Sequence, residues 1–406
     1  MPIPDFNLNK AKFGRILIRL LFFCILVDFL SGLFLLSFNI DTKLSMLYKA
    51  SILSLCFFYI ALSSFMTFVL VFLSVVWVYF VVTLNYFVLD SNTIFFEYTL
   101  AFKILAFPVL FCFVYLLQRD QNKLFCSSVG NLLTFGYFVI VANVISGYFG
   151  FGFRTYESSQ VGFKGYFFAG NELSAVFMVF STYIIQKYAI SSSLYKYFLV
   201  AAFNLFIGVS IGTKAGIIYS LLSPLVIFVI SNRYNHKRNV KFLLVVAIFT
   251  VVSLSSLFVV ISDLQAIEKL LYNFSSGGVV HLLFSGRDFW LETIYANLQS
   301  SNFIYHYIFG YGSSFISALI GKNIVEIDPV DVYLVFGVFA LFYFVAFSFV
   351  SLYIPFKNLR SKHSPGVFVL NLALVLFAII AGHVWTSGML PFAWSMYFYC
   401  CVQSEV

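Results

Sequence analysis

Long apolar runs without a charged side chain constrain this chain more than any other feature of its sequence. From Ala50 to Leu89, 40 consecutive residues contain no Asp, Glu, Lys or Arg. A membrane-crossing helix needs about 20 mostly apolar residues, so this stretch is long enough for two crossings. Hydrophobic residues make up 62% of the chain and charged residues 10%, against about 45–50% and about 25% in soluble domains. We therefore expect a polytopic membrane protein.

Twelve membrane-crossing helices are predicted from the apolar runs, so residues 1–406 are expected to form a single polytopic domain of the all-α class. The first run is too long for a signal peptide and lacks a cleavage site, so it is expected to remain as an uncleaved span. The predicted spans are residues 15–38, 45–63, 66–88, 98–118, 127–148, 171–188, 195–211, 213–231, 242–262, 330–354, 366–385 and 387–402.

The basic residues predict which side of the membrane each loop faces. Lys and Arg gather in cytoplasmic loops, and most of them fall on the inner side when both termini are placed in the cytoplasm. The formal net charge of +8 is then explained by the basic residues of the cytoplasmic loops. It is not expected to mark a nucleic-acid surface, where basic residues cluster on one face beside aromatic partners.

One large hydrophilic loop, residues 263–329, is left outside between the ninth and tenth spans, and a shorter segment covers about residues 149–170. The large loop is longer than a connection needs. It is predicted to contain an amphipathic helix at residues 264–274 and a second short helix that begins near Asp288. The inner loops contain no nucleotide-binding glycine loop, which argues against an ATP-driven pump. Any chemistry is therefore expected to face outward.

Ionisable residues at the mouth of a helix bundle are functional candidates. Arg154, Lys164 and Glu172 lie in or beside the shorter outer segment, and Lys214 lies in the turn SIGTKAG, almost flush with the membrane. Each of these residues also has a purely structural explanation. The loop cations could meet lipid phosphates, the carboxylate could cap the helix that follows, and Lys214 could extend to head groups rather than into a cavity.

The large loop supplies the residue best suited to bind a phosphate group. Arg287 in FSGRDFW is predicted to project from the start of the second short helix, with Trp290 within one turn. A guanidinium grips phosphate with two parallel hydrogen bonds and keeps its charge at any relevant pH. The structural alternative is a salt bridge from Arg287 to Asp288, Glu292 or another acid of the loop.

Three acids and one histidine complete the set of candidates. Glu326, Asp328 and Asp331 precede the tenth span, where they could act as a base, contact a sugar, bind a divalent cation or simply be solvated. No His or further acid stands beside them, and the six cysteines lack metal-ligand spacing, so neither a metal nor a cofactor is expected. His383, at the end of the eleventh span, could shuttle a proton or satisfy a hydrogen bond.

Five short motifs lie in order between about residues 150 and 340: GYFFAGNELSAV, SIGTKAG, FSGRDFW, IFGYGSSF and PVDVYLVFGV. In order and spacing they resemble the motifs of the bacterial O-antigen polymerases of the Wzy type and of the related O-antigen ligases. The chain departs from that pattern at two points. Lys214 stands where the family commonly has arginine, and Val330 and Asp331 stand where ligases typically have a His-Asn pair.

The resemblance implies a GT-C-like membrane fold and glycosyl transfer at the periplasmic face of a bacterial inner membrane. The donor would be a glycan on undecaprenyl pyrophosphate, and the acceptor a lipid-linked repeat unit. Cations would stabilise the leaving group, a carboxylate would serve as base, and a regulator could set the chain length. The implied catalytic residues are Arg287, Lys214, Glu172 and Asp331, and those implied to bind pyrophosphate or glycan are Arg154, Lys164, Trp290 and His383.

Three other functions remain open at this point. A ligase would move finished glycan onto the lipid A core by nearly the same chemistry, but the His-Asn pair is absent. A lipid-linked oligosaccharide flippase also has about twelve spans; transporters, however, usually place charges at mid-membrane, and we assign only Asp28 and Lys103 clearly to span interiors. A structural membrane subunit would explain the spans but not the outer bases.

Overall fold

The computed structural model describes residues 4–89, 93–119, 124–156, 161–190, 193–232, 274–275, 278–281, 283–298 and 303–402. Its helices and strands are α1 (Pro4–Phe38), α2 (Leu44–Ser63), α3 (Phe65–Leu89), α4 (Ile94–Arg119), α5 (Leu124–Tyr148), β1 (Phe153–Tyr156), β2 (Val161–Gly165), α6 (Gly170–Ile190), α7 (Leu194–Ile211), α8 (Lys214–Ser231), α11 (Arg287–Leu298), α12 (Phe303–Phe309), α13 (Gly312–Ile320), α14 (Asp328–Lys357), α15 (Ser364–Ile380) and α16 (Leu390–Val402).

Within the described residues, nine helices are long and apolar enough to cross a membrane. They correspond to the first eight predicted spans and to the tenth, so the chain is a helical, multi-pass membrane protein. The ninth predicted span, residues 242–262, and most of the predicted amphipathic helix at residues 264–274 lie outside the described residues. The second short helix of the large loop is confirmed as α11, which begins at Arg287.

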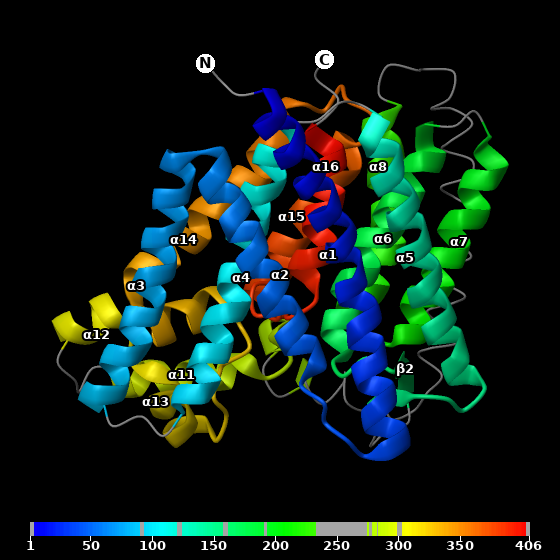
Figure 1. The fold of residues 1–406 in the computed structure, drawn as a ribbon. Coiled ribbons are helices and arrows are strands. Elements are labelled where there is room, and N and C mark those ends of the chain that lie inside the picture. The colour runs from blue at the N-terminus through cyan, green and yellow to red at the C-terminus, as the bar shows by residue number, and fades with distance from the viewer. Residues whose placement is uncertain are drawn as a thin grey trace.

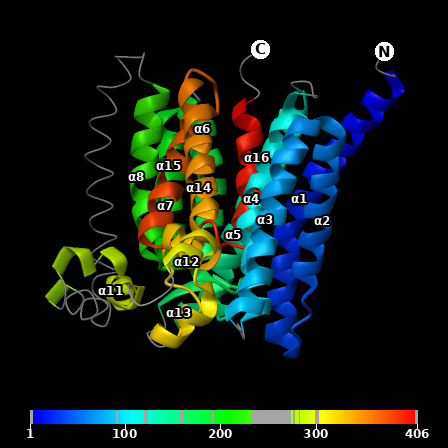
Figure 2. The same cartoon turned by 90° about the vertical axis from the view of Figure 1, so that its left-hand side faces the viewer.

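Burial separates the helices of the core from those that face lipid. Within the apolar 18-residue stretch of each helix, 78% of α4 and 83% of α6 is buried inside the protein, against 22% of α3. Helix α6 lies at the centre of one half of the bundle, against α5, α7, α8, α15 and α16. Both termini lie at one end of the bundle, and α11, α13 and the strands lie at the opposite end (Figures 1 and 2). We call this opposite end the site end.

The segment before α6 forms a β-hairpin, which the all-α prediction did not include. Strands β1 and β2 pair antiparallel. The hairpin packs onto the turn between α7 and α8: Thr155 Oγ1 donates a hydrogen bond to the carbonyl of Ile211 at 2.7 Å. A Cβ on Gly162 would lie 2.4 Å from the same oxygen, so only glycine allows this close approach. The hairpin therefore belongs to the site end.

The eleventh and twelfth predicted spans are both shorter in the structure than expected. Helix α15 has 17 residues and α16 has 13, which is about 25 and about 20 Å of helix against a hydrocarbon thickness of about 30 Å. Between them, residues 381–389 form an irregular, largely buried segment. We call it the re-entrant segment. Non-helical backbone at such a depth requires protein partners for its N–H groups.

Carboxylates supply those partners. Asp328, at the start of α14, accepts hydrogen bonds from the backbone N–H groups of His383, Val384 and Trp385 at 2.8–2.9 Å. It also accepts one from the hydroxyl of Thr386 at 3.1 Å. Further along the segment, Gly388 N–H donates to Oε1 of Glu172 at 3.2 Å.

Helix α14 is broken at Gly337, where φ is 80° and ψ is −176°. A Cβ at this position would lie 1.9 Å from the carbonyl oxygen of Ile308, so glycine permits the end of α12 to dock against the break. The side chain of Asn85 in α3 donates to the carbonyls of Phe309 and Val335, at 3.0 and 3.4 Å. These bonds join the carbonyl at the end of α12 to one beside the break in α14, so both polar groups have a partner.

We predict that Gly337→Ala destabilises the protein more than Gly150→Ala. Both residues have positive φ, and left-handed backbone costs an alanine about 1–2 kcal/mol; only Gly337 is also blocked by a backbone carbonyl, whereas no atom lies within 4 Å of a Cβ at Gly150. Melting temperatures in detergent, measured by fluorescence-detected size exclusion, will show the difference. Equal losses in the two variants would contradict the role assigned to the Ile308 contact.

Candidate functional site

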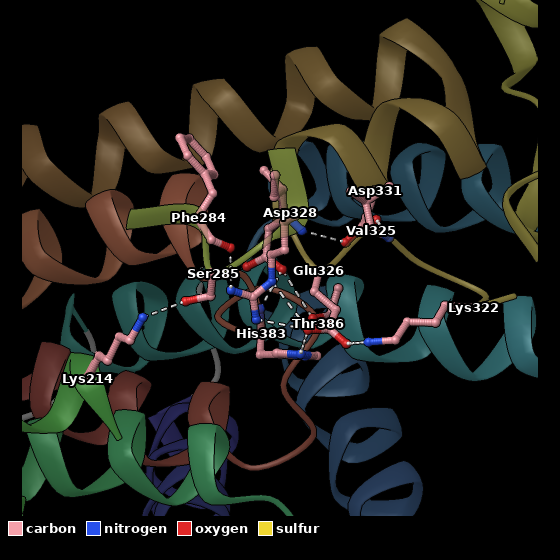
Figure 3. A network of polar contacts seen from close by, with 12 residues as sticks. Lys214, Phe284, Ser285, Lys322, Val325, Glu326, Asp328, Asp331, His383 and Thr386 are labelled. Carbon is pink, nitrogen blue, oxygen red and sulfur yellow. Dashed lines mark hydrogen bonds and ion pairs between the residues drawn. The ribbon is translucent and has the colours of Figure 1, made fainter. Parts of the chain in front are cut away.

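Glu326, in the loop between α13 and α14, is the hub of a polar network at the site end (Figure 3). Its Oε2 accepts hydrogen bonds from Arg287 NH2 at 2.9 Å and Nε at 3.3 Å. Its Oε1 accepts one from Lys322 at 2.9 Å. His383 Nε2 lies 3.7 Å from Oε2. A single carboxylate thus holds three basic side chains from α11, its own loop and the re-entrant segment.

The backbone of this network is strained. Among the described residues, five non-glycine residues have positive φ, and three of them belong to the network: Ser285 at 57°, Glu326 at 68° and His383 at 62°. Such conformations cost on the order of 1–3 kcal/mol each and persist only when the surroundings impose them. They cluster at active sites and ligand clamps in other proteins. The strain therefore marks this network as a candidate functional site.

Two buried aspartates of α14 hold the strained loops in place. Asp328 binds the re-entrant segment, as described above. Asp331 accepts hydrogen bonds from the backbone N–H groups of Val325 at 2.6 Å and Ile327 at 3.1 Å, on either side of Glu326. Both aspartates are fully buried. Asp331, a candidate base on sequence grounds, therefore shapes the loop in this arrangement and does not face a cavity.

Lys214 joins the network through the loop before α11. Its Nζ donates a hydrogen bond to Ser285 Oγ at 3.0 Å. Thr213 caps α8 by accepting from Gly216 N–H at 3.1 Å, and its hydroxyl lies 2.5 Å from that of Ser174 in α6. These contacts place Lys214 at the first position of α8, beside the loop that carries Arg287.

A cavity of about 360 Å³ opens next to the network. Glu172, at the start of α6, lies in its wall, where Oε1 is 3.8 Å from Lys103 Nζ of α4. His383 contributes to both the cavity wall and the Glu326 network. The other polar side chains of the wall are Thr99, Thr155, Tyr156, Asn171 and Thr386.

The charges of the network are coupled. Burial alone would raise the pKa of Glu326, but the nearby His383 and the hydrogen bonds from Lys322 and Arg287 outweigh it and hold the pKa well below its usual range. Burial alone would lower the pKa of His383, but the hydrogen bond to Glu326 and the charges of Asp328 and Glu326 raise it above 6.5. The pairing with a carboxylate therefore favours the imidazolium form of His383.

The structure brings four of the residues predicted from sequence together around Glu326 and the cavity, and it places Asp331 and Trp290 against the loop that carries Glu326. Arg154 and Lys164 lie apart from them. Arg287, Lys214 and His383 belong to the network, and Glu172 shares the cavity with His383. The salt-bridge alternative for Arg287 is confirmed, although its partner is Glu326: Asp288 instead contacts His281 Nδ1 at 2.8 Å.

Arg154, Lys164 and Trp290 take part in contacts between a cation and an aromatic ring. Arg154 stacks on Phe163 at 4.2 Å from the ring centroid, and Lys164 lies 5.6 Å from the Phe153 ring. Both lie on the hairpin and neither lines the cavity. The ring of Trp290 lies beneath Lys322 at 4.1 Å, where it supports that cation.

Two cations of the site were not predicted as functional. Lys103 was recognised only as an ionisable residue inside a span, which is itself a signal of function. Lys322 carries no local motif, because only the folded loop brings it to Glu326 and Trp290. Within the described residues, no group of three or more His, Cys, Asp or Glu side chains lies close enough to hold a metal ion.

The fold and the site define a class: a multi-pass helical membrane protein with a re-entrant segment and a charged cavity at one end of its bundle. Comparison with protein-family models, with curated proteins and with solved structures yields no match to the chain. Its function is therefore inferred from the site.

We predict that His383 and His363 contribute to stability with opposite dependence on pH. The raised folded pKa of His383 means that its stabilising effect is present below about pH 6.5 and is lost as the pH rises through the folded pKa. His363, at the opposite end, has a pKa lowered to about 4 by burial and by Lys362; its effect is present above about pH 6.5 and is lost as the pH falls.

The measurement is the melting temperature of the wild type, His383→Gln and His363→Gln between pH 5 and 9. The difference in melting temperature between wild type and His383→Gln should shrink towards pH 9. The difference between wild type and His363→Gln should shrink towards pH 5. A His383 gap that widens with rising pH would show that the imidazole is neutral beside Glu326.

Proposed function

We propose that the protein polymerises oligosaccharide repeat units carried on undecaprenyl pyrophosphate, by glycosyl transfer at the periplasmic face of a bacterial inner membrane. The observation that carries this proposal is the cluster of basic side chains around one carboxylate. Arg287, Lys322 and His383 share the carboxylate of Glu326, with Lys214 nearby. Such a site favours an anionic ligand, and polar groups of the adjacent cavity can bind sugar hydroxyls.

In the proposed reaction, a hydroxyl of the acceptor sugar attacks the anomeric carbon of the donor glycan. The new carbon–oxygen bond forms as the bond to pyrophosphate breaks, and the electron pair leaves with undecaprenyl pyrophosphate. Arg287 stabilises the developing charge, with Lys214 beside it. Glu172 accepts the proton of the hydroxyl. It is the carboxylate that lines the cavity, whereas Asp328 and Asp331 are occupied by backbone N–H groups.

The location of the site agrees with lipid-linked substrates. The elements that carry the network and the cavity wall, among them α11 and the hairpin, lie at the end of the bundle opposite both termini (Figure 1). The helices around them expose large apolar side chains to the bilayer. With both termini in the cytoplasm, that end is periplasmic, as the distribution of basic residues predicts. The proposed partners are lipid-linked glycans, membrane lipids and a regulator of chain length.

We predict that Arg287→Ala abolishes long polymer and leaves single lipid-linked units to accumulate, because the leaving group loses its main cation. The variant Arg287→Ala/Glu326→Gln distinguishes this role from mere neutralisation of Glu326. If Arg287 serves the reaction, the double variant stays inactive although Glu326 no longer carries the charge that Arg287 would neutralise. The measurement is the glycan ladder of a deletion strain complemented with each variant.

The control is Arg360→Ala, which removes an exposed arginine near the opposite end and should leave the ladder unchanged. Recovery of long polymer in the double variant would overturn the assignment of Arg287. The deletion strain also separates polymerase from ligase: core with one repeat unit indicates a polymerase, and bare core with polymer trapped on the carrier indicates a ligase.

A transporter of lipid-linked oligosaccharides is the second candidate, because two observations favour it. Asp28 and Lys49 form a buried ion pair within α1 and α2, and the re-entrant segment and the break at Gly337 resemble the discontinuous helices of transporters. Purified protein in vesicles that contain a fluorescent lipid-linked oligosaccharide will separate the two. Movement of label across the bilayer without any longer product would replace the polymerase with the transporter.

A further inference from the structure

A buried histidine closes the turn from which Arg287 projects. His281 is 3% exposed, and its Nδ1 lies 2.8 and 2.9 Å from the two carboxylate oxygens of Asp288. A carboxylate accepts hydrogen bonds, so Nδ1 is the donor. The His281 ring also packs on the ring of Phe289, with 4.4 Å between the centroids. One side chain thus contacts both residues that follow Arg287. We call His281 and Asp288 the turn clamp.

The turn between these two residues holds the strained backbone in front of Arg287. Ser285 and the glycine after it have φ values of 57° and 88°. Arg287 NH1 donates to the carbonyl of Phe284 at 3.4 Å, and Lys214 of α8 donates to Ser285 Oγ (Figure 3). Strained backbone persists only where its surroundings impose it. The turn clamp joins the two ends of this turn, so it is placed to impose the strained conformation.

Capping of α11 does not explain the turn clamp. An acid in the first turn of a helix suits the helix dipole, and a capping side chain accepts hydrogen bonds from the N–H groups of its helix. Among the described residues, Asp288 instead makes its hydrogen bonds with His281, which precedes the helix by six residues. The contact therefore fixes the backbone before α11 against the first turn of α11.

We propose that His281 and Asp288 are positioning residues for Arg287: they hold the turn that directs its guanidinium to Glu326 and, in the proposed reaction, to the leaving group. The second half of this inference rests on the proposed function, whereas the position of Arg287 can be measured without it. Arg287 NH2 lies 2.9 Å from Glu326 Oε2. A displacement of a reacting group by about 1 Å can lower a rate about 100-fold, so a distant contact of this kind can matter for catalysis.

The test compares His281→Leu with His281→Asn. Both variants remove the ring, but the amide of asparagine can donate to Asp288 from nearly the position of Nδ1, and leucine has no donor. The probe is phenylglyoxal, which modifies arginine, with the rate at Arg287 followed by mass spectrometry on the purified protein. In the wild type this rate should be low, because the Arg287 side chain is 11% exposed and pairs with Glu326.

We expect His281→Leu to raise the modification rate of Arg287 by on the order of tenfold, the factor that corresponds to one hydrogen bond to a charged group. His281→Asn should stay close to the wild type. Asp288→Leu should act like His281→Leu, and the double variant should react no faster than either single variant, because all three lose the same contact. Arg154, half-buried on the hairpin, is the internal reference: general loosening of the site end would raise its rate as well.

The matched control is His306→Leu. His306 also lies at the site end, its Nδ1 donates to the carbonyl of Gly310 at 3.2 Å, and its ring stacks on Tyr311 with 4.4 Å between the centroids. Both of these partners follow α12, and neither belongs to α11. His306→Leu should therefore leave the modification rate of Arg287 unchanged.

The glycan ladder of complemented cells is the second readout. His281→Leu should shorten or abolish the polymer, and His281→Asn should restore it. An unchanged rate at Arg287 in His281→Leu, or the same increase in His281→Asn, would overturn the positioning role. Faster modification of Arg287 together with a normal ladder would support the positioning role and contradict the part of Arg287 in the proposed reaction.

Discussion

Backbone N–H groups that are buried away from water must find acceptors, and the site end of this protein depends on how that requirement is met. Helices satisfy it internally, but the re-entrant segment cannot. Its N–H groups bind the carboxylates of Asp328 and Glu172. Because these acids belong to α14 and α6, the segment ties two long helices together. An apolar residue at either position would leave polar backbone exposed to a low-dielectric interior, at a cost of about 1–3 kcal/mol per group.

The same contacts set the geometry of the charged groups. Asp328 holds the N–H of His383, and Asp331 holds N–H groups on both sides of Glu326, so a buried carboxylate fixes two of the three strained residues of the network. The same buried carboxylates therefore stabilise both the strained backbone and the positions of the ion-paired side chains. A site on such a frame is preorganised, since its cations do not have to be gathered when a ligand arrives.

The sequence allowed the spans to be predicted because each is a local property of about 20 residues. The start of α11 was predicted for the same reason. The shortening of α15 was not predicted, because Val384 and Trp385 are as apolar as a helix requires, and only the distant Asp328 makes an irregular backbone acceptable there. Likewise, Asp331 and Glu326 look alike in sequence, and folding alone turns one towards backbone N–H groups and the other towards three cations.

In the proposed reaction, Glu326 also explains how an anionic ligand can enter without collapse of the site. Pyrophosphate would compete with the carboxylate for Arg287, because both bind a guanidinium through parallel hydrogen bonds. Glu326 retains Lys322 on its other oxygen and His383 beside it, so it would not be left as an unpaired buried charge. The exchange then costs far less than the loss of an isolated ion pair. A hub with three basic partners is therefore better suited to repeated binding and release of an anion than a single buried pair would be.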